Sequence, residues 1–215
     1  MKRCVIVSAG QIENFSLVQN QLLEDDFFIF CDGGLSYASA LGVVPDIIVG
    51  DFDSCDEKLL AEYEGKSQII KLPREKDDTD TFYAVKYALK LGFDSFLLLG
   101  SMGARFDHAL GNVSILLYLF KHGKNAILID DYSKMQIVGE KSVFIPNDCA
   151  YFSLLTIAGD VSGVTIKNAK YPLQDASLSC DFQLGISNEV LPGKTAEVSV
   201  KEGNILLVEI GRASC

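Results

Sequence analysis

The chain has 215 residues, of which 48% are hydrophobic and 22% charged, as in an ordinary soluble globular protein rather than a disordered one. This length allows one large domain or two modest ones. The net charge of −10 argues against double-stranded nucleic acid as a partner, because clustered lysines and arginines are what hold phosphate backbones. The charge is still compatible with a nucleotide, since a bound metal ion reverses the local electrostatics.

Six cysteines occur without a C-x-x-C pair or a spacing typical of metal ligands. Disulfide frameworks usually belong to short secreted chains, so we expect reduced cysteines and a cytoplasmic protein. The apolar run near the amino end is too short for a secretion signal, and no stretch approaches the roughly 20 apolar residues of a membrane helix. We therefore expect no membrane association.

Through about residue 130, apolar runs with strand character alternate with segments of helical spacing. The expected strands are residues 4–7, 27–31, 47–49, 68–72, 96–99 and 126–129. Three groups at helical spacing lie among them: Phe15, Val18 and Leu22; Phe82, Val85 and Leu89; and Leu110, Val113, Leu117 and Phe120. Gly42, Gly92 and Gly123 stand where left-handed helix caps are needed. The alternation predicts βαβ units, and hence an α/β domain with a Rossmann-like, mostly parallel sheet and flanking helices.

After about Asp131 the pattern changes to short runs rich in β-branched and aromatic residues, broken by Gly, Pro, Asn and Asp. These runs are residues 135–138, 142–145, 151–157, 161–167, 176–182, 195–200 and 205–210. We therefore expect a smaller all-β domain here, a sandwich or a partly closed barrel. The expected boundary gives domains of residues 1–131 and 132–215.

Asp51 and Asp53 follow an apolar run that is typical of a buried strand. Two carboxylates one residue apart can share a cation, and Mg²⁺ takes oxygen ligands while leaving room for phosphate. A solvated acidic turn is an equally simple interpretation of an isolated Asp-x-Asp. Three further polar clusters, around Asp32, Asp80 and Asp107, also follow apolar runs. Strand carboxyl ends converge on one crevice in an open α/β sheet, which favours a metal-phosphate site.

Asp32 is followed by Gly33 and Gly34, directly after one expected strand. Paired glycines let a backbone approach a phosphate closely, and a helix that follows offers its amino end to an anion. Gly-Gly turns are common, so the signal is weak by itself. Neither G-x-G-x-x-G nor the P-loop pattern is present, which counts against both of those nucleotide-binding signatures.

A charged segment precedes the predicted helix of residues 81–91. Asp78 or Thr79 suits its N-cap, and acidic residues in a first turn favour the helix dipole. Capping does not account for Lys76 together with three aspartates, Asp77, Asp78 and Asp80. A site that binds both metal and phosphate would use both signs of charge.

The segment 100–108 lies between an expected strand and the next helix. Arg105 can hold phosphate oxygens in a bidentate manner, and Asp107 can cap the helix. His108 is more often a packed or capping residue than a general base.

A D-x-D pair after an apolar strand also occurs in phosphohydrolases of the haloacid-dehalogenase type. That family has Thr or Val two residues after the second aspartate, whereas Cys55 stands there in this chain. The match therefore fails at a diagnostic position.

Taken together, the motifs resemble the thiamine pyrophosphokinase family. Those in the first half are Asp32-Gly33-Gly34, then Gly42, Pro45-Asp46 and Gly50-Asp51-Phe52-Asp53-Ser54, then Lys76-Asp77-x-Thr79-Asp80, and Gly103-x-Arg105-x-Asp107-His108 followed by Asn112. Those in the second half, similar to the family's thiamine-binding β domain, are Gly163-Val164-Thr165, Lys170-Tyr171-Pro172-Leu173 and Gly185-Ile186-Ser187-Asn188-Glu189. Each motif alone is unspecific, but the ordered set is specific and spans nearly the whole chain.

The resemblance implies an enzyme that moves a pyrophosphoryl group from ATP to the thiamine hydroxyl with Mg²⁺, giving AMP and thiamine diphosphate. It implies an ATP-binding catalytic domain, a thiamine-binding β domain and a homodimer with the site at the subunit interface. By motif, the catalytic residues, which bind Mg²⁺ and the triphosphate, would be Asp32, Asp51, Asp53 and Asp80. The nucleotide contacts would be Gly33, Gly34, Lys76, Asp77, Thr79, Arg105, Asp107, His108 and Asn112. The thiamine contacts would be Ser187 and Asn188.

One departure concerns the thiamine wall, because some family members stack thiamine on a tryptophan soon after the Ser-Asn pair and this chain has none. We expect Val190 or Leu191 in that place. On the residues alone, Ser187-Asn188 also suits a hairpin turn. Two other functions fit the acidic loops, namely a metal-dependent phosphohydrolase and a non-catalytic regulator that binds nucleotide or thiamine. No residue identifies itself as the general base.

Overall fold

The structure is a computed structural model that describes residues 2–53, 56–75, 77–182 and 184–211. The chain divides into two compact units, Met1–Asp131 and Tyr132–Cys215. Each unit has a hydrophobic cluster made of its own residues. Within the described residues, no helix is both long and apolar enough to cross a membrane.

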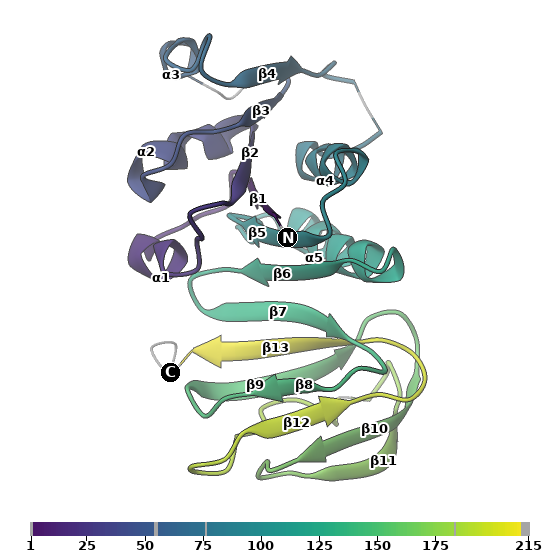
Figure 1. The fold of residues 1–215 in the computed structure, drawn as a ribbon. Helices are drawn as coiled ribbons and strands as arrows, with labels where there is room; N and C mark the ends of the chain where they lie inside the picture. The colour runs from purple at the N-terminus through teal and green to yellow at the C-terminus, as the bar shows by residue number, and fades with distance from the viewer. Residues whose placement is uncertain (1, 54–55, 76, 183, 212–215) are drawn as a thin grey trace. The chain divides into compact units, whose positions relative to one another are not determined.

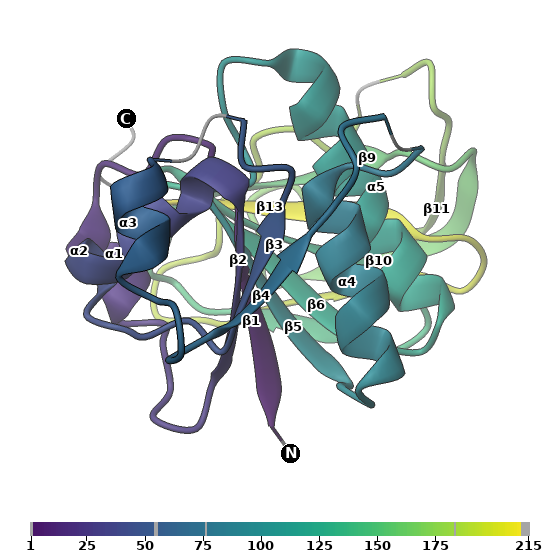
Figure 2. The ribbon, with the colours of Figure 1, turned by 90° about the horizontal axis from the view of Figure 1, so that it is seen from above.

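The first unit is a parallel sheet covered by helices on both faces (Figures 1 and 2). The strand order is β4-β3-β2-β1-β5-β6, with every neighbouring pair parallel. The strands are β1 Arg3–Val7, β2 Phe27–Cys31, β3 Ile47–Gly50, β4 Gln68–Lys71, β5 Ser95–Leu99 and β6 Asn125–Ile129. Helices α1 Phe15–Gln19, α2 Ala38–Leu41 and α3 Glu57–Ala61 lie on one face, and α4 Asp80–Lys90 and α5 Phe106–Lys121 on the other. The predicted α/β architecture is confirmed.

The inner strands are buried on both sides, which is why they read as nearly continuous apolar runs. Residues 4–7 of β1 and 96–99 of β5 are all buried. The chain proceeds from β1 to β4 in one direction and from β5 to β6 in the other, so the strand order reverses between β1 and β5. In sheets of this type the crevice at such a reversal is the usual ligand site.

Helix ends follow the sequence closely, but helix faces do not. The caps at Gly42, Gly92 and Gly123 have φ of 73°, 88° and 69°, as the sequence predicts. The apolar face predicted for α5 is not its packing face, because Leu110 is 52% exposed. The buried residues of α5 are Ala109, Asn112, Ile115, Leu116 and Leu119. This helix is apolar on most sides, so spacing alone does not select the side that meets the sheet.

Two local predictions also change. The segment expected to be a helix after β2 begins as a 3-10 helix, Asp32–Tyr37, and only Ala38–Leu41 is α-helical. Helix α3 was not predicted; Asp56 caps it, accepting a hydrogen bond from the Lys58 backbone N–H at 2.9 Å. This helix has five residues, little more than one turn, and is therefore too short to show a helical period in the sequence.

The second unit is a sandwich of two antiparallel sheets, as predicted. One has the order β7-β13-β9, with β7 Ser133–Val138, β13 Ile205–Gly211 and β9 Cys149–Thr156. The other has the order β11-β10-β12-β8, with β11 Leu173–Leu178, β10 Val161–Lys167, β12 Ala196–Ser199 and β8 Val143–Ile145. Valine, isoleucine and leucine side chains from both sheets form the core. The strand predicted at 176–182 instead spans Leu173–Leu178, because register shifts and the left-handed Asp175 (φ 52°) break the period-two pattern.

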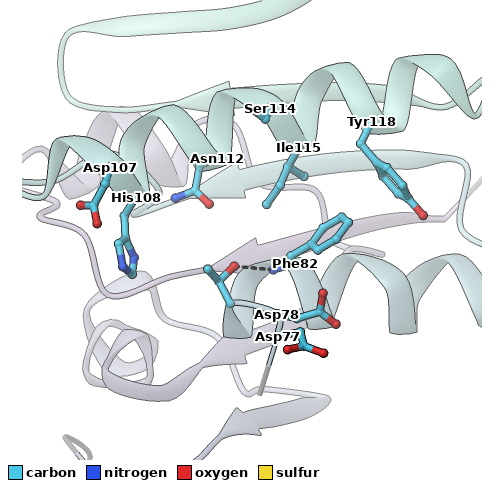
Figure 3. Close-up of a pocket in the computed structure, with 11 residues that line it drawn as sticks. Asp77, Asp78, Phe82, Asp107, His108, Asn112, Ser114, Ile115 and Tyr118 are labelled. Atoms are coloured by element: carbon cyan, nitrogen blue, oxygen red, sulfur yellow. Dashed lines mark hydrogen bonds between the residues drawn. The ribbon is translucent and has the colours of Figure 1, made fainter. Parts of the chain in front are cut away.

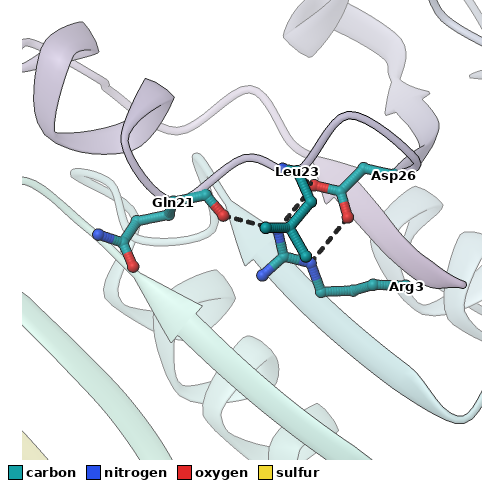
Figure 4. A network of polar contacts seen from close by, with 4 residues as sticks. All are labelled: Arg3, Gln21, Leu23 and Asp26. Carbon is teal, nitrogen blue, oxygen red and sulfur yellow. Dashed lines mark hydrogen bonds and ion pairs between the residues drawn. The ribbon is translucent and has the colours of Figure 1, made fainter. Parts of the chain in front are cut away.

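A buried ion pair fixes the start of β1 to the connection between α1 and β2 (Figure 4). The Arg3 guanidinium donates to both carboxylate oxygens of Asp26, at 2.9 and 2.6 Å, and to the Gln21 carbonyl at 2.6 Å. Asp26 also accepts the Leu23 backbone N–H at 2.8 Å. The Asp26 side chain is fully buried, so its charge is stabilised by these partners rather than by water.

Candidate active site

The carboxyl ends of the central strands are packed backbone against backbone. A Cβ atom on Gly34 would lie 2.5 Å from the Val7 carbonyl oxygen, and one on Gly100 would lie 2.3 Å from the Ser8 carbonyl oxygen. Only glycine fits at such approaches. The glycine expected to face a phosphate at position 34 therefore has a packing role, whereas Gly33 has only the Ala9 side chain nearby.

Three of the four predicted aspartates meet at this edge. Asp32 follows β2 and Asp51 and Asp53 follow β3, and one carboxylate oxygen of each lies within 4.8 Å of the other two. Asp32 and Asp51 are half-buried and Asp53 is exposed. An Arg74 guanidinium pairs with Asp53 at 2.7 Å. Three like charges this close repel one another, and an all-oxygen donor set suits a hard divalent cation.

The loops that carry this cluster are conformationally strained. Asp32 and Phe52 are in the left-handed region, with φ of 45° and 61°. Aspartate tolerates that region better than a bulky residue does. The Asp53 backbone N–H donates to an Asp51 carboxylate oxygen at 3.2 Å, which holds the turn. Strain of this kind is retained where the surrounding structure fixes the loop, often at functional sites.

The fourth aspartate, Asp80, is the first residue of α4 and lies outside the group of three, as far as the described residues show. Asp80 and Asp32 nevertheless act on the same buried thiol, that of Cys31. Burial raises the pKa of the Cys31 thiol, and the charges of Asp80, Cys4 and Asp32 raise it further. A buried hydrogen bond of 2.7 Å between the Ser8 and Thr81 hydroxyls joins the end of β1 to α4 beside Asp80.

A cavity of about 550 Å³ lies between α4 and α5 (Figure 3). It is lined by Asp77, Asp78, Thr79, Phe82, Asp107, His108, Gly111, Asn112, Ser114, Ile115 and Tyr118. Five of these were predicted as nucleotide contacts: Asp77, Thr79, Asp107, His108 and Asn112. The sequence placed Phe82 with the packing face of its helix, whereas the buried face of α4 consists of Thr81, Ala84, Val85 and Ala88. No periodic signal separates a cavity-facing aromatic residue from a core one.

The side chains around the cavity already have defined partners. Thr79 is the N-cap of α4 and accepts the Phe82 backbone N–H at 3.2 Å. Asn112 is buried and its amide donates to the Ser101 carbonyl at 2.6 Å, which fixes α5 to the loop after β5. Arg105 and Asp107 form an exposed ion pair at 2.6 Å.

Asp107 is not the N-cap of α5, contrary to the sequence-based expectation. Helix α5 begins at Phe106 with Arg105 as its N-cap residue, so Asp107 lies in the first turn and is not the cap. The hydrogen bond from Arg105 holds the pKa of the Asp107 carboxyl below its ordinary value. His108 is exposed on the same turn.

In the second unit, the Asn188 side chain is hydrogen-bonded to neighbouring backbone groups. Its side-chain oxygen accepts the Tyr171 and Glu189 backbone N–H groups at 3.0 and 2.9 Å, and its amide donates to the Tyr171 carbonyl at 2.8 Å. Asn188 is 4% exposed, so these bonds act in a dry environment. Ser187 is exposed with φ of 58°, and its backbone N–H donates to the Ser153 hydroxyl at 3.1 Å.

Of the two residues expected to contact thiamine in place of a tryptophan, only Leu191 is accessible to a ligand. Val190 is 8% exposed and belongs to the sandwich core, so the expectation for that residue is wrong; Leu191 is 40% exposed. Tyr171, held on both sides by Asn188, has a ring that is well exposed. The predicted contact Lys76 and the motif residue Ser54 lie outside the described residues.

Two family models match the chain in order. The model for the thiamin pyrophosphokinase catalytic domain matches residues 18–128, and the model for the thiamin pyrophosphokinase vitamin B1 binding domain matches residues 141–205. The chain belongs to the thiamin pyrophosphokinase family. The catalytic-domain match contains all four predicted aspartates, and the second contains Ser187 and Asn188.

Individual thiamin pyrophosphokinases match over most of their length. The thiamine pyrophosphokinase of Bacillus subtilis is 28% identical over 211 residues, which cover 97% of this chain and 98% of that one. Thiamin pyrophosphokinase 1 of Caenorhabditis elegans is 24% identical over 179 residues, 77% of this chain and 70% of that one.

Solved structures of the family have the same fold. The crystal structure of the Bacillus subtilis enzyme superposes with a TM-score of 0.87 at 24% identity, covering 99% of this chain and 100% of that one. That of Geobacillus thermodenitrificans gives 0.84 at 23% identity, covering both chains fully at 100%.

Proposed function

We propose that this member of the thiamin pyrophosphokinase family transfers the pyrophosphoryl group of ATP to the hydroxyl of thiamine, giving thiamine diphosphate and AMP. The observation that carries the proposal is the convergence of three carboxylates within 4.8 Å at the ends of β2 and β3, inside a chain that both family models match. Transfer of this kind requires chiefly positioning and neutralisation of phosphate charge. A cluster of carboxylates with a divalent cation fits that requirement.

Asp32, Asp51 and Asp53 are the residues that we propose hold Mg²⁺, and we propose that Asp80, the first residue of α4, completes the metal-binding set. When bound, the cation neutralises charge on the phosphate oxygens and favours departure of AMP. The left-handed turns at Asp32 and Phe52 hold the carboxylates near one another before the substrate binds. Asp80 is the first residue of α4, and the residues directly before it line the cavity.

The nucleotide contacts that we propose are grouped by the cavity. Asp77, Thr79, Asp107, His108 and Asn112 line it. Arg105 is exposed and pairs with the exposed Asp107, so its guanidinium can turn toward a phosphate at little cost. Gly33 and Lys76 complete the proposed contact set, and Gly34 supports it by its close packing against the Val7 carbonyl. Asn112 would act mainly by positioning, because its amide donates to Ser101.

For thiamine, we propose that Ser187 contacts the pyrimidine and that Asn188 positions the contact surface. The Asn188 side chain has three hydrogen bonds inside the protein, two of which fix the Tyr171 backbone. The exposed Tyr171 ring is the aromatic surface beside it, and aromatic faces attract cations such as the thiazolium of thiamine. Tyr171 therefore takes the place of the missing tryptophan in this proposal.

The assembly and location that we propose are a homodimer, with the site completed at the subunit interface, in the cytoplasm. The location is supported by Cys4, Cys31 and Cys180, which are free cysteines. Neither nucleic acid nor a membrane is proposed as a partner, given the net charge of −10.

An AMP-release assay tests the reaction. With ATP and Mg²⁺, AMP should form only when thiamine is added, and EDTA should abolish it. Asp51→Asn and Asp53→Asn should each lower turnover by orders of magnitude, because each removes a ligand of the metal ion. Nucleotide hydrolysis without thiamine would instead indicate a phosphohydrolase, and tight binding without turnover would indicate a regulator.

A further inference from the structure

Arg74 forms an ion pair with one of the three clustered aspartates. A nitrogen of its guanidinium lies 2.7 Å from an Asp53 carboxylate oxygen. Asp53 is also one of the three residues that bring carboxylate oxygens within 4.8 Å of one another. The proposed reaction gives this ion pair no role, although the pair neutralises a carboxylate that we propose as a metal ligand.

The backbone places Arg74 at the same edge of the sheet as the cluster. β3 and β4 are parallel neighbours, and beyond them the Leu72 backbone N–H donates to the Gly50 carbonyl at 2.8 Å. Leu72 is 7% exposed, so it anchors the segment that follows β4. Pro73 then restricts the backbone of that segment. Asp53 and Arg74 therefore follow two neighbouring strands that are joined up to their last residues, and their side chains meet across that edge.

The pair is open to solvent, unlike the pair of Arg3 and Asp26. The Arg74 side chain is 78% exposed and the Asp53 side chain is 43% exposed. An exposed ion pair contributes little to stability, because water solvates both charges and the entropy of two side chains opposes the contact. The fold therefore does not require this pair, and the guanidinium can leave Asp53 at little cost when another anion is offered.

A bare metal ion and a metal–polyphosphate complex meet opposite electrostatics at this site. The three carboxylates attract a bare divalent cation, but the Arg74 guanidinium neutralises part of their charge and repels another cation at short range. The complex of a divalent cation with tripolyphosphate or ATP carries a net negative charge instead. Its phosphate oxygens suit the planar fork of guanidinium donors, which can hold them in a bidentate manner. Arg74 therefore disfavours the bare ion and favours the complex.

We propose that Arg74 is a specificity-determining residue, which makes the acidic cluster select a metal–polyphosphate complex over the bare metal ion. This inference rests on the proposed function, and it adds the form in which the metal is accepted. In the free protein the guanidinium is paired with Asp53. When the complex binds, the guanidinium passes to the phosphate oxygens and the Asp53 carboxylate becomes available to the metal.

Two binding titrations test the inference, because they should respond to Arg74→Gln with opposite signs. Mn²⁺ alone, followed by electron paramagnetic resonance, should bind about two- to fivefold more tightly, the range expected for loss of an exposed ion pair. Inorganic tripolyphosphate with Mg²⁺, followed by isothermal titration calorimetry, should bind roughly tenfold more weakly, because a charge-assisted hydrogen bond is lost. A purely structural role of Arg74 would weaken both. Changes of the same sign, or no change in either affinity, would overturn the inference.

Two further variants separate the guanidinium from the loss of one positive charge. Lys167→Gln removes a charge from an exposed ion pair of 3.0 Å with Glu197 in the second unit, and it should change neither affinity. Arg74→Lys keeps the charge but loses the planar fork, so it should keep the wild-type affinity for Mn²⁺ and lose part of the affinity for tripolyphosphate. If Lys167→Gln changed both affinities as much as Arg74→Gln does, net charge would be the cause and the inference would be wrong.

The AMP-release assay separates this inference from the proposed function. If the wild type forms thiamine-dependent AMP but Arg74→Gln has wild-type affinities, the role of Arg74 is wrong and the proposed function stands. If the wild type forms no such AMP but the two affinities shift in opposite directions, the proposed function fails and the selectivity stands. If neither Mn²⁺ nor the tripolyphosphate complex binds to the wild type or to Arg74→Gln, the inference is wrong, because no metal ion then reaches the cluster.

Discussion

At the scale of single residues, the site depends on backbone contacts as much as on carboxylates. Gly50 ends β3 directly before the Asp51 turn, and a Cβ there would lie 3.0 Å from the Asp32 Cβ and 3.1 Å from its Cα. Asp32 is itself left-handed, with φ of 45°. The two loops of the carboxylate cluster are therefore packed without free space between them, and the position of Asp32 follows from the absence of a side chain at residue 50.

Gly50→Ala should weaken metal binding. The added methyl pushes the Asp32 loop away by a few tenths of an ångström, and displaced supporting groups typically cost about 10- to 100-fold in metal affinity. Titration with Mn²⁺ alone, followed by electron paramagnetic resonance, measures this. Gly111→Ala adds the same methyl where nothing lies within 4 Å and should leave the affinity unchanged. A Gly50→Ala protein with wild-type affinity would show that the close approach is unimportant.

Cys4 makes the folded state sensitive to alkali. Its thiol is fully buried in β1, and burial raises its pKa, with the charges of Asp46 and Asp26 adding to the rise. The folded thiol keeps its proton where the unfolded one loses it. Its contribution to stability is fully present below the ordinary thiol pKa of about 8.5 and falls as pH rises from there toward the raised pKa, by up to about 1.4 kcal/mol per pH unit.

Urea unfolding at pH 7, 9 and 10 measures this effect. Wild type should lose stability over that range, and Cys4→Ala, although less stable at pH 7 because of the lost packing, should lose less between pH 9 and 10. Equal slopes for the two proteins would contradict the assignment to Cys4.

At the scale of elements, polar bonds join pieces that the hydrophobic pattern leaves independent. The Ser8–Thr81 hydrogen bond joins β1 to α4, Asn112 joins α5 to the loop after β5, and Arg3 with Asp26 joins β1 to the segment before β2. All of these bonds are at least partly buried. Removing one partner therefore costs more stability than the intact bond contributes, because the other partner is left buried without a hydrogen bond.

Arg3→Met should lower the free energy of unfolding by roughly 3 kcal/mol, because it leaves the buried Asp26 carboxylate without its bidentate partner. The double variant Arg3→Met, Asp26→Leu should recover part of that loss, since no charge is then left buried. Chemical denaturation of the three proteins measures the difference. A double variant no more stable than Arg3→Met would show that the ion pair is not the cause.

At the scale of the whole molecule, the two units have separate cores and match separate family models. The acidic cluster and the cavity belong to the first unit, and Ser187 and Tyr171 belong to the second. If the two units bind different substrates, the reaction requires that the two binding surfaces face each other. The proposed homodimer supplies this if one subunit presents nucleotide to the thiamine surface of its partner.

Complementation of two inactive variants tests that arrangement. Asp51→Asn removes a metal ligand, and Tyr171→Lys sets a like charge against cationic thiamine. Each alone should be nearly inactive, whereas a dimer formed from one of each has one intact site. Co-refolded at equal amounts, the mixture should recover about a quarter of wild-type activity, because half of the dimers are mixed and each has one of two sites. No recovery, despite mixed dimers in native mass spectrometry, would place the site within a single subunit.

The sequence by itself determined the strands of the first unit, the helix caps and the positions of Asp32, Asp51 and Asp53 after their strands. It also determined the family, through the order of motifs. These features depend on near neighbours in the chain, such as runs of buried β-branched residues, glycines with positive φ and carboxylates at strand ends.

Only the tertiary structure decided which side of each helix is buried. It also decided that Phe82 faces a cavity, that Val190 lies in a core, and that the Asn188 amide donates a hydrogen bond to Tyr171. Apolar periodicity gives the same signal for a core face and for a cavity wall, because both are made of apolar side chains. What separates them is whether another element lies opposite, and that is fixed by contacts between residues far apart in the chain.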